Sequence, residues 1–489
     1  MSGNRPPYRV AVVGAGAAGT LTAAQLLRKA EGAGRRIEVL LIDPAARTGP
    51  GTAYRTSDPR HLLNVPAGRM SAFPDDPEHF LCWLGADRRS ASPGDYLPRQ
   101  VYGRYLTEVL ERTEATCRRA VLHRVRDRVI AVRAPGSEGL FLRLAGGDEK
   151  RVDAAVLALG GLTPGDDWAD AQLRGSGRFV ADPWAPGALG GVPDDRDVLL
   201  VGTGLTMVDL AVTLVRPGRV VHALSRHGLL PGEHLLQPAP AAAPPVLSDT
   251  DTLDGLRREV LRYLSVNRRA HADWRPGMDG LRPVTAALWQ RLSVADRSRF
   301  LREDLRTWEV HRHRMAPETA AAVREIMASG RLRVSKGEVT RTAQDEEAVE
   351  VRLTDGRRLR VGAVVNCTGA WTDVRRTADP LVRSLLDRGH ARPGPACLGI
   401  DTSGDGRLVP GGSGTTAPLW VVGALRRGNL LETTAIPEIR VQAAEVASSV
   451  LSASTAPTAP TQYVHGRAGA RPPVPDLPDF PLRPRGRVR

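Results

Sequence analysis

The segment Val10–Ala11–Val12–Val13–Gly14–Ala15–Gly16–Ala17–Ala18–Gly19 decides the fold class of this chain. Its first four residues are an apolar run typical of a buried parallel strand. Gly14 permits a tight turn, Gly16 lets backbone N–H groups approach a pyrophosphate, and Gly19 lets the next helix pack closely on the strand. We expect that helix over Thr20 to Lys29, with the N–H groups at its start, including those of Ala17 and Ala18, facing the phosphates. The segment therefore predicts a dinucleotide-binding unit.

An acidic residue supports this interpretation. A second apolar strand is expected over Ile37–Ile42, and it ends at Asp43. A carboxylate about twenty positions past the glycines can bind both ribose hydroxyls of an adenosine. A glycine-rich turn without a ligand is the alternative. The agreement of strand, glycines, helix and terminal acid favours a nucleotide.

A second glycine turn follows about two hundred residues later, in Asp197–Val198–Leu199–Leu200–Val201–Gly202–Thr203–Gly204–Leu205–Thr206–Met207. Met207 stands where a third glycine would be, and we expect Thr206 to cap the helix. The next strand ends at Ser225–Arg226–His227, without an acid. A hydroxyl and a guanidinium suit a 2′-phosphate, which favours NADPH, with NADH still possible. The alternative for Arg226 is a solvated charge at a strand end.

Two such turns in one chain suggest a flavin brought face to face with a nicotinamide. We predict an α/β flavoprotein with two dinucleotide-binding domains, FAD on the first and NAD(P)H on the second. The expected parts are an FAD-binding domain at 1–165, an NAD(P)-binding domain at 195–375 with a helical insertion at 237–330, a C-terminal completion of the FAD-binding domain at 376–451, and a disordered Pro/Arg-rich tail at 452–489.

Several further segments are expected to approach the nucleotides. Strands Ala120–Val125, Arg128–Arg133 and Leu140–Leu144 are interpreted as a small inserted antiparallel sheet. Apolar strands that end in glycine let the backbone pass close to a ligand. We expect Thr433 and Thr434 to cap a helix over Ile436 to Leu451, with its N-terminus near the flavin ring. Candidate contacts from these segments and from the irregular loop at 59–71 are Asn64, Val65, Met70, Val125, Gly160, Gly369, Gly423 and Thr433.

Composition narrows the class of protein. The net charge is +14 with a pI near 10.4, yet the excess is nearly all arginine, spread along the chain without aromatic-interleaved patches. A solvated surface is therefore favoured over nucleic-acid binding. Cys82, Cys117, Cys367 and Cys397 lie far apart, so neither a disulfide framework nor a zinc site is predicted. The sequence shows no leader pattern and no apolar run of membrane-spanning length, so we expect a cytoplasmic protein without a membrane partner.

The motifs together resemble the HpyO/CreE-like FAD/NAD(P)-binding family over about residues 8–447. The matching pieces are Gly14-x-Gly16-x-x-Gly19, His61–Leu62–Leu63–Asn64–Val65–Pro66–Ala67, Tyr102–Gly103–Arg104–Tyr105, Leu200–Val201–Gly202–Thr203–Gly204–Leu205–Thr206–Met207–Val208–Asp209, Leu224–Ser225–Arg226–His227–Gly228–Leu229–Leu230–Pro231, Asp273–Trp274–Arg275, Val310–His311–Arg312–His313–Arg314 and Pro437–Glu438–Ile439–Arg440. They are specific for the family and only weakly specific for any one reaction.

The resemblance implies a flavin-dependent monooxygenase. Characterised relatives include urate hydroxylases and aspartate N-monooxygenases, which reduce FAD with a reduced nicotinamide and then activate O₂ as a C4a-(hydro)peroxide. The segment from Arg99 to Tyr105 is also similar to the flavin-contacting helix of N-hydroxylating monooxygenases, which makes Arg99 and Gln100 candidates to face the isoalloxazine. The leading hypothesis is therefore an NAD(P)H-dependent FAD monooxygenase that hydroxylates a small polar, nitrogen-containing metabolite.

Two alternative functions are compatible with the same two glycine turns. One is an oxidoreductase that passes electrons to a partner or quinone without oxygen insertion, and the other is a non-catalytic nucleotide-sensing protein. His61 and His234 are possible acid–base groups, but a lone loop histidine is more often structural. The arginines and histidines of 300–314 are interpreted as a solvated helix face in preference to an anion site. No residue is singled out as the catalytic acid or base, and the motifs indicate neither the substrate nor the oligomeric state.

Overall fold

The first glycine turn lies at the carboxyl edge of a parallel sheet. The computed structural model describes residues 6–32, 36–45, 47–87, 91–135, 139–369, 373–412 and 416–454. The first sheet has the order β16-β7-β1-β2-β3, and every pairing in it is parallel. Its strands are β1 (Tyr8–Val13), β2 (Ile37–Ile42), β3 (Ala120–Val125), β7 (Ala154–Leu157) and β16 (Leu419–Val421).

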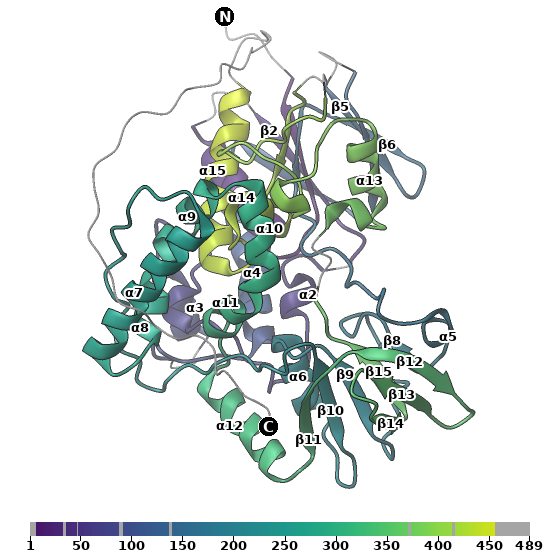
Figure 1. Ribbon diagram of the computed structural model, residues 1–489. Coiled ribbons are helices and arrows are strands. Elements are labelled where there is room, and N and C mark those ends of the chain that lie inside the picture. Colours follow the sequence, from purple (N-terminus) through teal and green to yellow (C-terminus); the bar gives the residue numbers. More distant parts are fainter. Residues whose placement is uncertain are drawn as a thin grey trace, which may run out of the picture.

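The second glycine turn lies at the carboxyl edge of a second parallel sheet, of order β11-β10-β9-β15-β8. Its strands are β8 (Phe179–Val180), β9 (Val198–Val201), β10 (Val221–Ser225), β11 (Leu332–Lys336) and β15 (Ala363–Asn366). This sheet therefore takes in β8, which precedes residue 195. The α/β fold class with two dinucleotide-binding units is confirmed, and Figure 1 shows the two sheets in separate halves of the molecule.

A three-stranded antiparallel sheet precedes β7 in the first unit and β15 in the second. In the first unit it contains β4 (Val129–Arg133), β5 (Leu140–Leu144) and β6 (Glu149–Val152), and in the second β12 (Val339–Gln344), β13 (Val349–Leu353) and β14 (Arg358–Val361). The expectation that 120–125 belongs to the antiparallel insert is wrong, because β3 pairs in parallel with β2 along its whole length. A short strand pattern does not reveal its partner. Four parallel strands and the antiparallel sheet thus follow the same order in the two units, whereas the fifth parallel strand comes last in the first unit (β16) and first in the second (β8).

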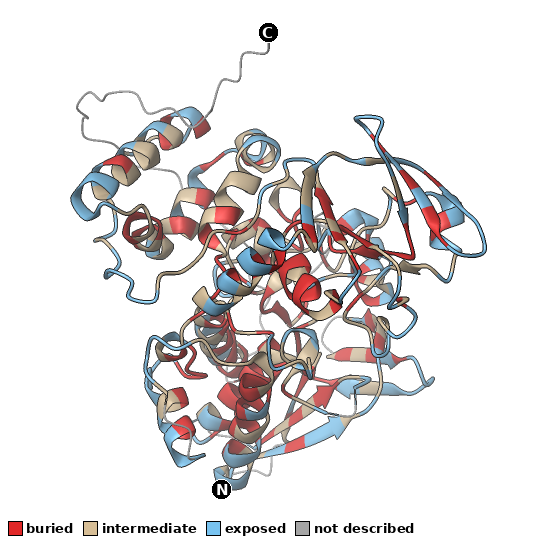
Figure 2. Cartoon of the chain, turned by 90° about the horizontal axis from the view of Figure 1, so that it is seen from below, coloured by how far each residue is buried: buried red, intermediate tan, exposed pale blue. Residues whose placement is uncertain are grey.

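Both parallel sheets are buried on both faces. Val10 and Val12 of β1 belong to one apolar cluster and Ala11 and Val13 to another. The alternation of side chains along a strand makes this division, because consecutive residues point to opposite faces. Figure 2 shows the buried residues concentrated along the sheets and the helices that cover them. Continuous apolar strands are what such two-sided burial requires.

The helices of the first unit begin and end close to the expected residues. α1 runs over Ala17–Ala30, three residues longer at its start than expected, and packs against α4 (Arg99–Thr116) and α15 (Ile436–Ala453). The others are α2 (Gly51–Tyr54), α3 (His79–Ala86), α13 (Pro380–Asp387) and α14 (Arg427–Leu430). The second unit carries α5 (Ala171–Arg174), α6 (Leu205–Leu214) and α12 (Pro317–Ala328).

A group of helices stands apart from the sheets, on the left of Figure 1. They are α7 (Leu253–His271), α8 (Arg275–Gly280), α9 (Thr285–Arg291), α10 (Val294–Glu303) and α11 (Leu305–Arg312). The helix face expected at 300–314 is divided between two helices, because the chain turns at Asp304 between α10 and α11. α12 falls inside the expected 237–330 insertion yet packs on α6 and β11 of the second unit. No described helix is long and apolar enough to cross a membrane, and the predicted tail lies outside the described residues beyond 454.

Candidate functional site: two nucleotide-binding edges and the contact between them

The first glycine turn tolerates no side chain at two of its positions. Gly14 has φ +101°, and a Cβ there would lie 2.4 Å from the carbonyl oxygen of Ala158. A Cβ on Gly19 would lie 1.8 Å from the carbonyl oxygen of Gly14. Gly16 is the N-cap of α1 and supplies no side-chain cap, so the N–H groups of Ala17 and Ala18 have no capping oxygen. The helix start is thus arranged to bind an anion.

Asp43 has a second role that the sequence did not indicate. Its Oδ2 accepts the N–H of Ala15 at 2.7 Å, and its Oδ1 accepts the N–H of Ala45 at 2.7 Å. The carboxylate therefore holds the glycine turn against the end of β2. Each carboxylate oxygen keeps a further lone pair, so ribose binding by Asp43 stays a prediction.

The second turn repeats the first. Gly202 has φ +113°, and a Cβ there would lie 2.3 Å from the carbonyl oxygen of Cys367, which follows β15 as Ala158 follows β7. Gly204 is the N-cap of α6, and a Cβ there would meet nothing within 4 Å. The prediction that Thr206 caps this helix is wrong, because Leu205 already begins it and no side chain caps it. Met207 is fully buried at the position of the third glycine.

Glycines that follow β7, β15 and β16 leave room at the same two edges. Gly160 (φ +71°) and Gly369 (φ +84°) follow β7 and β15, and a Cβ on either would meet nothing within 4 Å. Gly423 (φ +87°) follows β16, where a Cβ would lie 3.5 Å from the Cβ of Ala18. Open backbone beside unpaired helix amides is the surface that a dinucleotide needs. The residues present therefore fit one dinucleotide at each edge.

The loop before α15 is held together by buried hydrogen bonds. The hydroxyl of Thr433 donates to the carbonyl oxygen of Gly423 at 2.9 Å and accepts from Nε2 of Gln442 at 2.7 Å. The prediction that Thr433 and Thr434 cap α15 is therefore wrong. The helix begins at Ile436 with Ala435 as its N-cap, and it has no side-chain cap. Pro437 has no N–H and the N–H of Glu438 donates to the carbonyl oxygen of Ala435 at 3.2 Å, so Ile436 alone among the first three residues keeps an amide for a ligand.

The second edge carries cations that face solvent. Ser225 Oγ lies 2.8 Å from Thr203 Oγ1, which ties the end of β10 to the glycine turn. Within the described residues, the exposed guanidinium of Arg226 forms no hydrogen bond or ion pair. Lys336, which was not among the predicted cofactor contacts, ends β11 directly beside Ser225. Only the parallel pairing of β10 and β11 brings Arg226 and Lys336 to one place.

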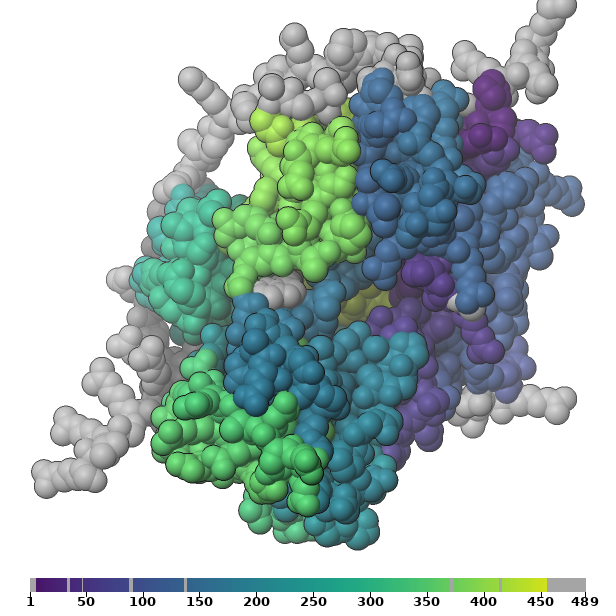
Figure 3. Space-filling view, turned by 90° about the vertical axis from the view of Figure 1, so that its right-hand side faces the viewer, coloured from purple at the N-terminus to yellow at the C-terminus, as the bar shows by residue number. Residues whose placement is uncertain are grey.

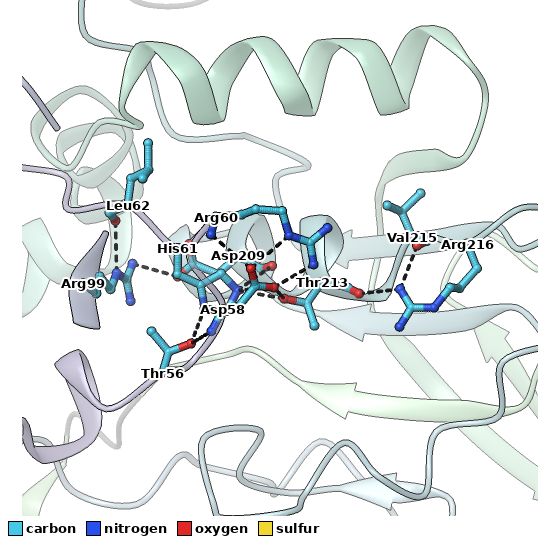
Figure 4. Close-up of polar contacts among 10 residues, drawn as sticks. All are labelled: Thr56, Asp58, Arg60, His61, Leu62, Arg99, Asp209, Thr213, Val215 and Arg216. Carbon is cyan, nitrogen blue, oxygen red and sulfur yellow. Dashed lines mark hydrogen bonds and ion pairs between the residues drawn. The ribbon is translucent and has the colours of Figure 1, made fainter. Parts of the chain in front are cut away.

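A buried ion pair joins the two units (Figure 4). Arg99 on α4 lies with Nη2 2.7 Å from Oδ2 of Asp209 on α6, and their side chains are 17% and 5% exposed. Nε of Arg99 also donates to the carbonyl oxygen of Leu62 at 3.1 Å. Burial raises the pKa of Asp209, and the charges of Arg99 and His61 oppose that rise. Arg99 is thus bound to the second unit, and its predicted contact with a flavin stays a prediction.

His61 belongs to the same contact between the units. Its Nδ1 lies 2.7 Å from Thr56 Oγ1, and its Nε2 lies 2.8 Å from Thr213 Oγ1 on α6. Thr213 in turn donates to Oδ2 of Asp58 at 2.9 Å. Burial would raise the pKa of Asp58, but hydrogen bonds from Arg60 and Thr213 hold it well below its usual range. The structural interpretation of His61 is supported, because both ring nitrogens are engaged.

The interpretation of 300–314 as a solvated helix face is wrong for three of its arginines. Arg312 is paired with Glu432 at 2.8 Å, and Arg314 contacts Asp279. Arg306 donates to the carbonyl oxygen of Thr203 at 3.1 Å and so covers the second glycine turn. These partners lie in distant parts of the chain, which a helical pattern cannot reveal.

The remaining candidates differ in burial, and only Asn64 is seen to contact the second unit. The carbonyl oxygen of Asn64 lies 3.2 Å from Nε2 of His234, whose pKa is lowered to about 3 mainly by burial. Val65 is buried and Met70, 1% exposed, packs in the core of the first unit. Gln100 is half-buried in the first turn of α4, and Val125, half-buried at the end of β3, accepts the N–H of Asp43. Figure 3 shows a hollow between the two halves, with the yellow C-terminal segment visible at its floor.

Comparison with known proteins agrees with this architecture. A family described as FAD-NAD(P)-binding matches residues 11–162, the part that contains the first turn. No curated protein sequence matches the chain.

Solved structures are similar over nearly the whole chain. L-lysine 6-monooxygenase from Pseudomonas syringae has a TM-score of 0.62 at 16% identity, covering 92% of this chain and 100% of that one. The reduced form of ornithine hydroxylase PvdA from Pseudomonas aeruginosa has a TM-score of 0.60 at 17% identity, covering 91% and 99%. The FAD-bound cadaverine monooxygenase DfoA from Erwinia amylovora has a TM-score of 0.59 at 12% identity, covering 95% and 100%. At these identities the likeness shows the fold.

Proposed function

We propose that this protein is an NAD(P)H-dependent FAD monooxygenase that hydroxylates a nitrogen atom of a small metabolite. The observation that carries the proposal is the pair of open glycine edges, which present unpaired helix amides in two units joined by the Arg99–Asp209 ion pair. The likeness in fold to lysine, ornithine and cadaverine monooxygenases, over at least 91% of the chain, supports the reaction class. The motif array supports placement in the HpyO/CreE-like family.

FAD is assigned to the first edge. The amides of Ala17 and Ala18 would bind the pyrophosphate, Asp43 the adenosine ribose, and the start of α15 the flavin ring. Bound there, FAD would supply the redox chemistry and the activation of O₂. The protein contributes position and a positive helix end, which stabilises negative charge on the reduced ring.

NADPH is assigned to the second edge. The amides at the start of α6 would bind the pyrophosphate, and Ser225, Arg226 and Lys336 would bind the 2′-phosphate. Arg306 holds the turn from the other side through Thr203. Two cations at one strand edge support NADPH over NADH, because the two cofactors differ in that phosphate alone.

The test uses the purified full-length protein. A yellow protein whose visible absorbance is bleached by NADPH without air is expected, and NADPH oxidation in air should accelerate with an amine substrate from a panel that includes ornithine, lysine, cadaverine and aspartate. An N-hydroxylated product formed in step with NADPH consumption supports the monooxygenase. Fast flavin reduction with no oxygenated product from any substrate would instead support an electron-transferring oxidoreductase. A protein that takes up no FAD would refute the proposal.

A further inference from the structure

An apolar cavity of about 320 Å³ lies inside the helical insertion, away from both glycine edges. Helices α7, α8, α9, α10 and α11 surround it, with Leu431 closing one side. Trp274, Trp289 and Trp308 contribute aromatic rings to the wall. Figure 1 shows these helices gathered on one flank of the molecule.

The cavity leaves apolar side chains without the packing they would have in a filled core. On α7, Leu253 and Leu256 are buried, whereas Val260, Leu261 and Leu264 are only half-buried although they face the other helices. Protein interiors are normally close-packed, and each apolar group left uncovered forfeits part of its burial energy. A space of this size is at the lower end of the range for small-molecule sites.

Several polar groups of the wall are already paired. Nε of Arg257 donates to Oδ2 of Asp304 at 2.9 Å, and Nε1 of Trp289 donates to the carbonyl oxygen of Gly428 at 2.8 Å. Nε1 of Trp308 donates to Glu432 at 3.2 Å, and Nδ1 of His311 lies 2.7 Å from the carbonyl oxygen of Thr307. A charged ligand would lose its hydration on this largely apolar wall and would find few free partners there.

We propose that this cavity is a binding site for a small, uncharged, hydrophobic molecule with an aromatic or cyclic body. Five helices and a loop line a pocket that is partly open to solvent, and its limited volume suits a small molecule. Rings of tryptophan offer stacking and edge contacts to such a body. The proposal does not depend on which nucleotides bind at the two glycine edges.

The cavity lies against α11, so a bound molecule would act on the contact between α11 and the second glycine turn. Thr307, Trp308 and His311 of α11 face the cavity, while Arg306 of the same helix reaches the second glycine turn at Thr203. An occupant therefore packs against one side of a helix whose other side holds that turn. Ligand binding stabilises α11 where it meets the second unit.

The test titrates the full-length protein with the neutral fluorescent probe N-phenyl-1-naphthylamine. One saturable site per chain, displaced by unlabelled indole, is expected. Hydrogen exchange of the unaltered protein with and without probe should show protection centred on α7–α11. Val260→Trp and Leu288→Trp fill the cavity from two helices, and each should raise the dissociation constant of the probe by at least about tenfold. Val266→Trp is the matched control, because Val266 lies on the same α7 helix, is 55% exposed and does not line the cavity.

Thermal melting of each variant checks that it is folded, and the hydrogen-exchange map needs no variant at all. The proposal is overturned by the absence of saturable binding, by protection that lies outside α7–α11, or by equal probe affinity in folded Val260→Trp and unaltered protein. Loss of probe binding as the protein concentration rises, together with dimer formation, would identify a second copy as the occupant and would likewise overturn it.

Discussion

Removing Arg99 is expected to leave a buried, uncompensated carboxylate between the two units. In Arg99→Met the aliphatic stem is kept, but Asp209 loses the guanidinium 2.7 Å away. Breaking a buried pair by removing one partner typically costs about 3–5 kcal/mol, because the remaining charge stays desolvated. With side chains 17% and 5% exposed, solvent screens this pair little.

The pH dependence follows from the direction of the Asp209 pKa. Burial already raises that pKa above its unfolded value, and removal of Arg99 raises it further. A carboxyl with a raised folded pKa favours the folded state below the unfolded pKa and loses that contribution as pH rises through the folded pKa. The defect of Arg99→Met should therefore be largest near about pH 8 and should shrink toward about pH 5, by at most about 1.4 kcal/mol per pH unit.

Urea unfolding followed by tryptophan fluorescence and circular dichroism measures the effect, with the same analysis at both pH values. Arg60→Met is the matched control: Arg60 pairs with Asp58 in the same cluster, but its side chain is 52% exposed, so a loss below about 1 kcal/mol is expected. The double variant Arg99→Met/Asp209→Leu should regain most of the lost stability. Equal losses in Arg99→Met and Arg60→Met, or no recovery in the double variant, would refute the reasoning.

Three further predictions concern the edges and a buried histidine. Gly14→Ala places a Cβ 2.4 Å from the carbonyl oxygen of Ala158 and should abolish FAD binding. Gly202→Ala places a Cβ 2.3 Å from the carbonyl oxygen of Cys367 and should give a yellow protein that NADPH reduces slowly. Visible absorbance measures the flavin content and anaerobic reduction measures the rate, and equal flavin content in the two variants would count against the assignment. Arg226→Ala and Lys336→Ala should each raise KM for NADPH by about tenfold with KM for NADH unchanged, as steady-state assays would show; equal effects on both cofactors would exclude a phosphate contact. Because the pKa of His234 is lowered to about 3, its contribution to stability is present above the unfolded value of about 6.5 and is lost as pH falls toward about 3, by about 1.4 kcal/mol per pH unit. His234→Gln should accordingly flatten the acid side of a plot of urea midpoint against pH. An unchanged acid side would show that His234 takes up no proton when the protein unfolds.

The sequence was most informative where one residue type alone can meet a backbone requirement. Gly14, Gly19 and Gly202 occupy positions where a Cβ would overlap a carbonyl oxygen, so the pattern of glycines after an apolar strand predicted both turns correctly. Strands buried on both faces must be apolar throughout, which is why β1, β2 and β9 were recognisable. Local chemistry alone decides such features.

Helix caps and strand partners were predicted less well. Thr206 and Thr433 are of the residue type that caps helices, yet one lies inside α6 and the other binds Gly423 and Gln442. The strand Ala120–Val125 was recognised but assigned to the wrong sheet, since its pairing with β2 joins residues about eighty positions apart. A side chain's residue type does not reveal which of several partners the fold brings to it.

By itself, the sequence determined that this chain has two parallel α/β units, each with an open glycine turn, because glycine and apolar runs act within a few residues. Tertiary structure alone decided that the two units share the order of four strands, that Arg99 pairs with Asp209 across them, and that Lys336 stands beside Arg226. It also decided that five helices of the insertion line an apolar pocket. These features depend on contacts between distant residues, whose energy depends on burial and mutual position and is not encoded in any local pattern.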